Sequence, residues 1–285
     1  MKKCITTIFY LTDNFCQEYQ KWEQNNLIPT NKKRNRSSIL SLSELLTIVL
    51  YFYISPCQDF KNYYLYYLSS KYKGYFQLPS YVRVVQLWPR LILPLSLMMH
   101  MLKGEKTGIY FIDSTKLQIC HNKRTSSNRV FGKIAKMGKS SYGWFMGVKL
   151  HIIINNKGAI MAIKITKGNN SDISAANSLA KDLNGTIYGD KGYISKKLFE
   201  QLFAEGVRLF TGIRKDMHNH LLPMSDKILM RKRVLIESVF NVLKNSMKLE
   251  HSRHRSPANF IVHVLACIHS YSLAKITNQR NFLAP

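Results

Sequence analysis

Acidic residues are scarce in this chain of 285 residues, which carries 16 Asp and Glu against 42 Lys and Arg and so has a formal net charge of +26. A net charge of about 2–8 is enough to keep a small domain soluble, so solubility alone does not explain the excess. A folded chain this basic indicates a polyanionic partner, with nucleic acid ahead of a membrane surface.

Cysteine is also scarce, and no two cysteines form a C-x-x-C pair. The five cysteines are odd in number and scattered along the chain, which argues against a disulfide framework or a cysteine zinc site. A reducing compartment fits this pattern. The cysteines are Cys4, Cys16, Cys57, Cys120 and Cys267.

Long apolar runs are absent from the sequence. Polar residues at 43–44 interrupt the run near residues 39–54, and prolines and an arginine interrupt the next at 89–94. Neither supplies the roughly 20 consecutive apolar residues that cross a bilayer. Residues 1–12 lack the strong apolar run of a signal peptide. We therefore expect a cytoplasmic protein without a membrane partner.

The length and the hydrophobic fraction of 46% indicate two folded domains. Residues 1–105 are expected to be mostly helical, with a capping box from Ser41 to Glu44 and further helices over 60–72 and from residue 80. The basic run at 32–36 precedes these helices. Short helices and basic residues suit a helix-turn-helix-like module that binds DNA ends. The alternative is a helical domain that only packs or dimerises.

Residues 106–285 are expected to form an α/β domain around a mixed five-stranded sheet. Strands are predicted over 108–113, 143–155, 159–167, 186–190 and 207–213, and helices over 172–183, 195–205, 226–247 and 257–276.

Two carboxylates end predicted strands of this domain, Asp113 and Asp190. No Asp or Glu occurs from Ser114 to Ser171, whereas 11 Lys and Arg do. An unpaired buried carboxylate is costly and has to be neutralised by a cation, a hydrogen-bond network or a metal. The carboxyl ends of strands are also where α/β sheets form their sites.

A third carboxylate, Glu237, lies on the predicted helix 226–247. At 100° per residue, Arg233, Asn241 and Lys244 fall within about 40° of it, and the apolar residues lie further round the helix. Three acids on two strands and a helix suit a pair of Mg²⁺ ions, which prefer carboxylate and phosphate oxygens.

Each acid also has a plain structural interpretation. Asp113 could cap a turn with Ser114, Asp190 could begin the turn at Lys191, and Glu237 could pair with Arg233 four residues earlier. The three acids together, inside so basic a chain, favour the metal site.

Three motifs of the chain resemble those of the DDE transposases of bacterial insertion sequences. The motifs are Tyr110-Phe111-Ile112-Asp113-Ser114-Thr115, Gly189-Asp190-Lys191-Gly192-Tyr193 and Arg233-x3-Glu237-x6-Lys244. The last is similar to the Tyr-x2-Arg-x3-Glu-x6-Lys signature of one large group. The segment from Gly143 to His151 and the run Thr166-x-Gly168-Asn169-x-x-Asp172 also resemble that group.

This resemblance implies an RNase H-like fold and a site in which Asp113, Asp190 and Glu237 ligate two Mg²⁺ ions, for which Mn²⁺ can substitute. It further implies that Arg233 and Lys244 contact phosphates near the cleaved DNA end. The partners would be double-stranded DNA, as terminal inverted repeats and as target, and a second copy of the chain. Met230 stands where the signature has Tyr, so that hydroxyl contact is missing or supplied elsewhere. A nuclease that cuts without joining and an inactive DNA-binding derivative remain alternatives.

Several further residues are weaker candidates. His151 is either an auxiliary site residue or a satisfied residue of the sheet, and Asp172 is either an auxiliary acid or, more favoured, a helix N-cap. A carboxylate-free loop is expected to bind DNA through Lys123, Arg124, Arg129, Lys133, Lys136 and Lys139. Arg253 and Arg255 lie in a basic hinge that either grips phosphate or is solvated. Trp88 and Trp144 are expected in the core.

Overall fold

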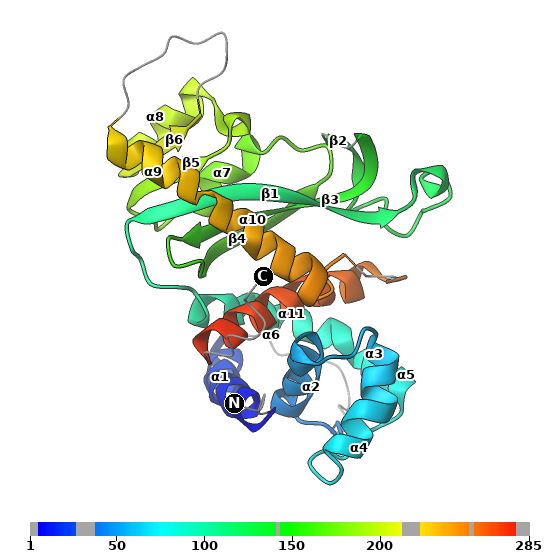
Figure 1. Cartoon of the computed structure of the whole chain (residues 1–285). Coiled ribbons are helices and arrows are strands. Elements are labelled where there is room, and N and C mark those ends of the chain that lie inside the picture. Colours follow the sequence, from blue (N-terminus) through cyan, green and yellow to red (C-terminus); the bar gives the residue numbers. More distant parts are fainter. Residues whose placement is uncertain (1–4, 27–37, 141–142, 213–222, 251–253, 278–285) are drawn as a thin grey trace. The chain divides into compact units, whose positions relative to one another are not determined.

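The computed structural model describes residues 5–26, 38–140, 143–212, 223–250 and 254–277 (Figure 1). The chain divides into two compact units. A helical unit comprises the chain up to Leu102 with Ser246–Leu249 and the segment from Ala258, and an α/β unit comprises Lys103–Asn245 and Glu250–Pro257.

Helices are present in the helical unit where the sequence predicts them, after residue 41, over 60–72 and from residue 80, and the unit also begins with a long helix. The predicted capping box is confirmed: the Ser41 hydroxyl accepts from the Glu44 amide, and the Glu44 carboxylate accepts from the Ser41 amide at 2.7 Å. The helices are α1 (Ile5–Asn26), α2 (Leu42–Ile54), α3 (Phe60–Asn62), the π-helix η1 (Tyr63–Leu68), α4 (Ser69–Lys71), α5 (Tyr81–Leu87), the 3-10 turn η2 (Trp88–Leu91), α6 (Ile92–Met101) and α11 (Pro257–Ile276).

Helix α11 packs inside the helical unit and not in the second domain, where its place in the sequence after residue 106 leads us to expect it. Nearly every residue from Phe260 to Ala274 is buried, and the Ser270 hydroxyl donates to the Leu50 carbonyl of α2 at 2.8 Å. A helix that is apolar on all sides has to be surrounded by other elements. A helix that packs on a sheet is covered on one side only, whereas α11 is buried among the other elements of the helical unit.

Two helical segments, Tyr81–Met101 and Pro257–Ile276, are long and apolar enough to cross a membrane by length and composition. Most of the second is buried within the structure. Core helices have this same property, so these segments are weak evidence for a membrane span.

The α/β unit contains the expected mixed sheet, with a sixth strand in addition. The order is β2-β3-β1-β5-β6, and β4 pairs with β3. Strands β1, β2, β3 and β4 pair antiparallel, whereas β5 is parallel to β1 and to β6. Their bounds are β1 (Ile109–Cys120), β2 (Lys136–Ser140), β3 (Gly143–Asn155), β4 (Ile160–Lys167), β5 (Gly185–Gly189) and β6 (Val207–Thr211).

Two predicted boundaries in this sheet are wrong. Strand β1 does not end at Asp113 but continues to Cys120, because ten of its residues pair with β3. Residues 136–140, predicted as loop, form β2 against the first residues of β3. Both segments are polar on their exposed positions, so the sequence there resembles a loop although backbone pairing makes it a strand.

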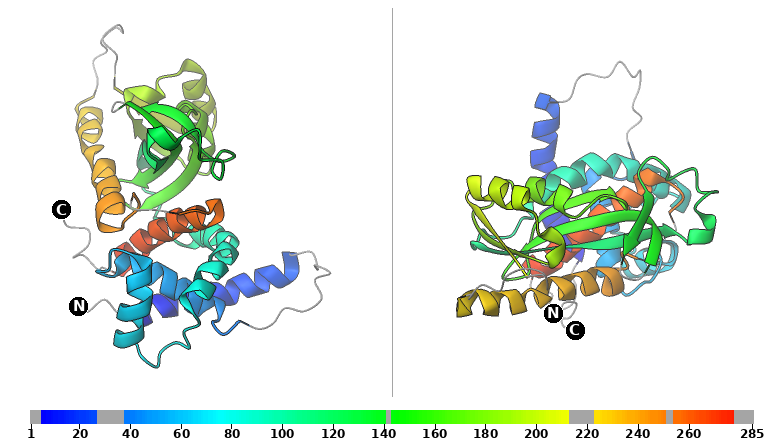
Figure 2. Two further views of the ribbon diagram at one scale, coloured as in Figure 1. Left: turned by 90° about the vertical axis from the view of Figure 1, so that its right-hand side faces the viewer. Right: turned by 90° about the horizontal axis from the view of Figure 1, so that it is seen from above.

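Helices cover both faces of the sheet, as the view from above in Figure 2 shows. Helices α7 (Ile173–Ala180) and α8 (Lys196–Ala204) pack on one face, over a core that includes Tyr110 and Ile112. Side chains alternate along a strand, so Phe111 and Asp113 point to the opposite face. Helices α9 (Met224–Lys232) and α10 (Val234–Asn241) cover that face, which therefore carries the first candidate acid.

The single helix predicted over 226–247 is interrupted at Arg233 and becomes a π-helix, η5, over Val242–Ser246. The amide of Arg233 donates to the Met230 carbonyl, and the amide of Ile236 donates to the Arg233 carbonyl, so the turn is locally tightened to i→i−3 bonds. The interruption lies at the residue whose side chain reaches the sheet.

Candidate active site

Asp113 and Asp190 lie side by side at the same level of the sheet. In the parallel pairing of β1 with β5, Phe111 is opposite Tyr188, and each acid follows two residues later. The two carboxylates therefore leave the same face of adjacent strands, the one that α9 and α10 cover. Strand β5 ends at Gly189, so Asp190 stands at a strand end as predicted, while Asp113 lies within β1 where its parallel neighbour ends.

Arg233 joins the third acid to the first. Its Nη1 atom lies 3.2 Å from Asp113 Oδ2, and its Nη2 atom lies 3.2 Å from Glu237 Oε1. The ion pair of Glu237 with Arg233, which the sequence offered as the plain alternative, is thus present. The same guanidinium also reaches across to β1, so the pair belongs to the cluster of acids.

The electrostatics of Asp113 show that the three acids share one environment. Burial raises its pKa to about 6, against the opposing effect of the Ser114 amide and of Arg233. The negative charges of Asp190 and Glu237 raise this pKa further. A carboxylate in this position is neutralised incompletely, and a cation beside it would stabilise its charged form.

The residues fit a divalent cation in chemistry, because all three acids offer the hard oxygen donors that Mg²⁺ prefers. Within the part of the chain that the structure describes, no three acid, histidine or cysteine side chains are grouped closely enough to hold a metal ion. Arg233 neutralises two of the three carboxylates instead. A metal bound by these acids would replace the contacts of that guanidinium.

A second polar contact on this face was not predicted from the sequence. The Tyr188 hydroxyl donates to Asp226 Oδ1 at 2.8 Å, and Arg208 Nη2 lies 3.3 Å from Asp226 Oδ2. Burial and the carboxylate of Asp226 raise the pKa of Tyr188. Since Tyr188 precedes Asp190 by two residues, this contact ties the strand of Asp190 to the helix that leads into Arg233. Side chains alternate along a strand, so Tyr188 and Asp190 share one face of β5, and this alternation was the signal in the sequence that could have identified Tyr188.

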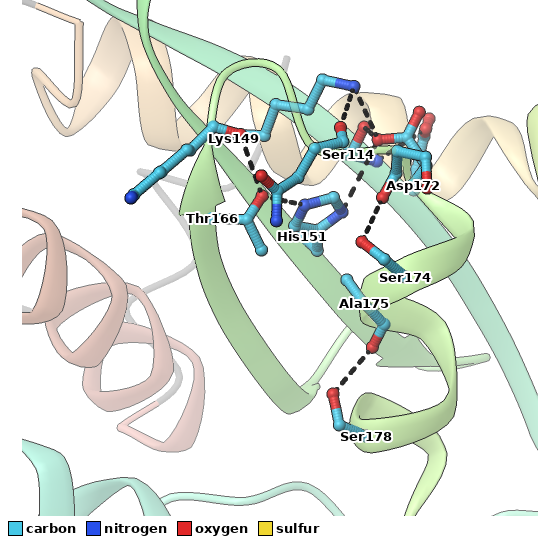
Figure 3. A network of polar contacts seen from close by, with 12 residues as sticks. Ser114, Lys149, His151, Thr166, Asp172, Ser174, Ala175 and Ser178 are labelled. Carbon is cyan, nitrogen blue, oxygen red and sulfur yellow. Dashed lines mark hydrogen bonds and ion pairs between the residues drawn. The ribbon is translucent and has the colours of Figure 1, made fainter. Parts of the chain in front are cut away.

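Asp172 and His151 lie on the opposite face of the sheet (Figure 3). Asp172 occupies the N-cap position of α7, but its side chain makes no capping bond, so the favoured interpretation as a cap is wrong. Its Oδ1 atom accepts instead from the Ser114 hydroxyl at 2.8 Å and from Lys149 Nζ at 3.2 Å. His151 is fully buried and its Nε2 atom lies 2.8 Å from the Thr166 hydroxyl. Burial lowers its pKa to about 4, so the ring is neutral at pH 7.

The basic segment after β1 is exposed but only partly a loop. Five of the DNA-binding candidates are exposed, and four of these lie in η3 (Asn122–Arg124) or β2: Lys123, Arg124, Lys133, Lys136 and Lys139. Trp144, expected in the core, is 60% exposed at the start of β3, with the Lys139 ammonium 5.9 Å from its ring centroid. Trp88 is buried as expected. This surface combines cations with an aromatic ring, a combination found on nucleic-acid-binding surfaces.

The remaining candidates are not brought into the cluster of acids. Lys244 lies in η5, and its ammonium pairs with Glu250 at 2.5 Å. Met230 is half-buried on α9. It lies close to Gly212, because a Cβ atom added to that glycine would be 3.8 Å from the Cε atom of Met230. Arg255 is exposed, and Arg253 lies outside the described residues.

Comparison with known proteins places this arrangement in a family. The family described as Transposase DDE domain matches residues 103–257, more than half of the chain. The chain belongs to this family of DDE transposases. Among curated proteins, none matches it.

One solved transposase structure shares the fold of this chain. The chain is similar to the piggyBac transposase in its synaptic complex with hairpin DNA, with a TM-score of 0.50, 9% identity, and coverage of 99% of this chain and 74% of that one. A further match is the transposase in the Mos1 strand transfer complex, with a TM-score of 0.25, 11% identity, and coverage of 90% and 86%. The mixed sheet with helices on both faces is the fold expected of a DDE transposase.

Proposed function

We propose that this DDE transposase binds the terminal inverted repeats of an insertion sequence, hydrolyses phosphodiester bonds at the element ends and transfers the freed 3′-hydroxyl to target DNA. The observation that supports this most is the convergence of the three acids of the family motif. Asp113 and Asp190 leave one face of adjacent strands, and Glu237 is joined to Asp113 through Arg233.

Asp113, Asp190 and Glu237 would hold two Mg²⁺ ions, or Mn²⁺ in their place. Such ions supply a hydroxyl nucleophile at neutral pH and stabilise the leaving oxygen of an in-line displacement. With the acids holding cations, Arg233 would leave both carboxylates, and its guanidinium would be free to bind a DNA phosphate. Lys244 is proposed to do the same after leaving Glu250.

The exposed cations around β2, with Arg255 and Arg253, are proposed to bind the DNA backbone. Each phosphate that they neutralise releases counterions, so affinity for DNA should fall steeply with salt. We further propose that two copies of the chain act together on paired DNA ends, in the cytoplasm of a bacterial cell and close to its DNA.

One test is cleavage and joining of labelled DNA that carries the ends flanking this gene, with Mg²⁺ or with EDTA. Glu237→Gln should lower cleavage by more than about 1,000-fold, equivalent to about 4 kcal/mol of the barrier, without loss of DNA binding. Glu200→Gln is the matched control, because Glu200 is an exposed acid of α8 that pairs only weakly with Lys196. Full cleavage by Glu237→Gln would contradict the site assignment.

An inactive DNA-binding derivative is the second candidate. The occupation of two acids by Arg233 and the Met at position 230 favour it. Specific binding to the ends without any cleavage in Mg²⁺ or Mn²⁺ would select this alternative, and Met230→Tyr would then be the first variant to test for recovery. Cleavage without joining would select a nuclease of the same fold.

A further inference from the structure

Asp172 makes a set of contacts that neither helix capping nor the three acids require. It lies at the start of α7, across the sheet from Arg233, and its Oδ1 atom accepts from the Ser114 hydroxyl and from Lys149 (Figure 3). The Nδ1 atom of buried His151 faces the same oxygen at 3.7 Å. One carboxylate oxygen therefore gathers three side chains from β1 and β3.

Ser114 connects this cluster with the site on the other face. Its backbone N–H donates to Asp113 Oδ1 at 2.8 Å, while its hydroxyl donates to Asp172 at 2.8 Å. Adjacent residues of a strand point to opposite faces, so Ser114 links the two faces through the sheet. The bond to Oδ1 leaves the Oδ2 atom of Asp113 directed at Arg233.

The charge of Asp172 is balanced locally. Lys149 Nζ donates to Asp172 and also to the Asn170 carbonyl at 2.9 Å, so the ammonium is held on two sides. His151 is neutral and buried beside it. The charge of Asp172 is thus balanced by Lys149 without a metal ion, and its hydrogen bond to Ser114 holds that residue of β1 in place.

We propose that Asp172 is a positioning residue that fixes the carboxylate of Asp113 through Ser114. The proposal rests on the function proposed above. With the Ser114 side chain held by Asp172, the backbone at Ser114 keeps its N–H on Asp113 Oδ1, and Oδ2 stays oriented toward the position between β1 and α10. Residues that orient a metal ligand in this way contribute about 10–100-fold to metal affinity.

A purely structural role, in which Asp172 only anchors α7 to the sheet, makes a different prediction. If Asp172 were only an anchor, its removal would speed amide hydrogen exchange in β1, β3 and β4 together. Loss of a positioning contact would loosen the Ser114 amide selectively and weaken metal binding, while leaving protected those amides of β4 that face β3, such as that of Lys164 opposite His151.

The experiment compares Asp172→Ala, Ser114→Ala and the double variant, with Asp172→Asn as the conservative replacement and Thr166→Val as the control. Asn retains an oxygen that accepts from Ser114. The control removes a hydroxyl at the far end of the cluster, beside His151. Amide hydrogen exchange of the metal-free protein is measured first, then the affinity for Mn²⁺ by calorimetry, and then cleavage.

We expect Asp172→Ala to speed exchange at Ser114 by about 10-fold and to weaken Mn²⁺ binding by about 10-fold, with most of both effects recovered in Asp172→Asn. The double variant should be no worse than either single variant, because the two residues act through one contact. Thr166→Val should stay within about two-fold of the unmodified protein.

Equal loss of protection across the sheet, or effects of Asp172→Ala no larger than those of Thr166→Val, would overturn the positioning role. Additive effects of Asp172→Ala and Ser114→Ala would overturn the route through Ser114. If the unmodified protein binds no Mn²⁺ and cleaves no DNA, the proposed function fails, and exchange at Ser114 still decides whether Asp172 holds that residue.

Discussion

The two units of the molecule surround a charged side chain in opposite ways. In the helical unit, the ammonium of buried Lys248 donates to the carbonyls of Ser55 at 2.9 Å and Phe52 at 3.3 Å, and lies 4.9 Å from the centroid of the Phe52 ring. In the α/β unit, the carboxylate of Asp113 receives one backbone amide and one guanidinium and is opposed by two further carboxylates. A charged group surrounded by hydrogen-bond partners stabilises the fold, whereas a charged group among like charges indicates a site for a ligand of opposite charge.

Removing the charge of Lys248 should give the largest loss of stability. Lys248→Met leaves the carbonyls at the end of α2 with fewer donors, and we expect the free energy of unfolding to fall by about 3 kcal/mol. Lys73→Met, at an exposed lysine of the same unit, should cost less than about 0.5 kcal/mol. Denaturant unfolding measures both. Equal losses of stability in Lys248→Met and Lys73→Met would contradict the stabilising role of Lys248.

Acid should destabilise both units through buried histidines. Burial lowers the pKa of His151 in the α/β unit and of His269 in the helical unit to about 4. The folded state binds fewer protons than the unfolded state, so this stability is complete above pH 6.5 and is lost as the pH falls from there toward 4. We expect about 2 kcal/mol per histidine to be lost by pH 5. A free energy of unfolding that stays flat from pH 7 to 5 would contradict this.

The pH dependence that Asp113 contributes should have the opposite sign to that of the histidines, and its effect should be smaller than that of the two histidines together. Its pKa in the folded state, about 6, lies above the ordinary value, so its charge destabilises the metal-free protein at neutral pH and this cost is relieved as the pH falls through 6. Asp113→Asn should therefore raise the free energy of unfolding at pH 7.5 by about 2 kcal/mol while abolishing cleavage. The gain should narrow below pH 6. A destabilised Asn variant would show that Arg233 outweighs the other two acids.

The sequence predicted those features that depend on local pattern. The Ser41 capping box, the apolar strand segments and the three acids of the family motif all follow from neighbours along the chain. The sequence could not predict pairing with distant strands, which extends β1 past Asp113 and turns the lysines at 136 and 139 into strand residues.

The sequence named the acids of the candidate site but not the contacts that join them. The spacing of Arg233 and Glu237 indicated their contact, but only the fold shows that Arg233 also reaches Asp113. Asp172 looked like an N-cap because it precedes a helix, and its true partners come from strands 58 and 23 residues earlier in the chain. The same holds for Asp226, whose partner Tyr188 is 38 residues away.

The central claim is that Asp113, Asp190 and Glu237 form one cation site from which Arg233 can be displaced. The most direct measurement is the shift of the melting temperature on addition of Mg²⁺, in the unmodified protein and in Asp113→Asn, without DNA. Mg²⁺ at ten times its dissociation constant stabilises a binding protein by about 1.4 kcal/mol. The account predicts this shift in the unmodified protein and in Glu200→Gln, and none in Asp113→Asn. An equal shift in all three, or no shift in the unmodified protein, would contradict it.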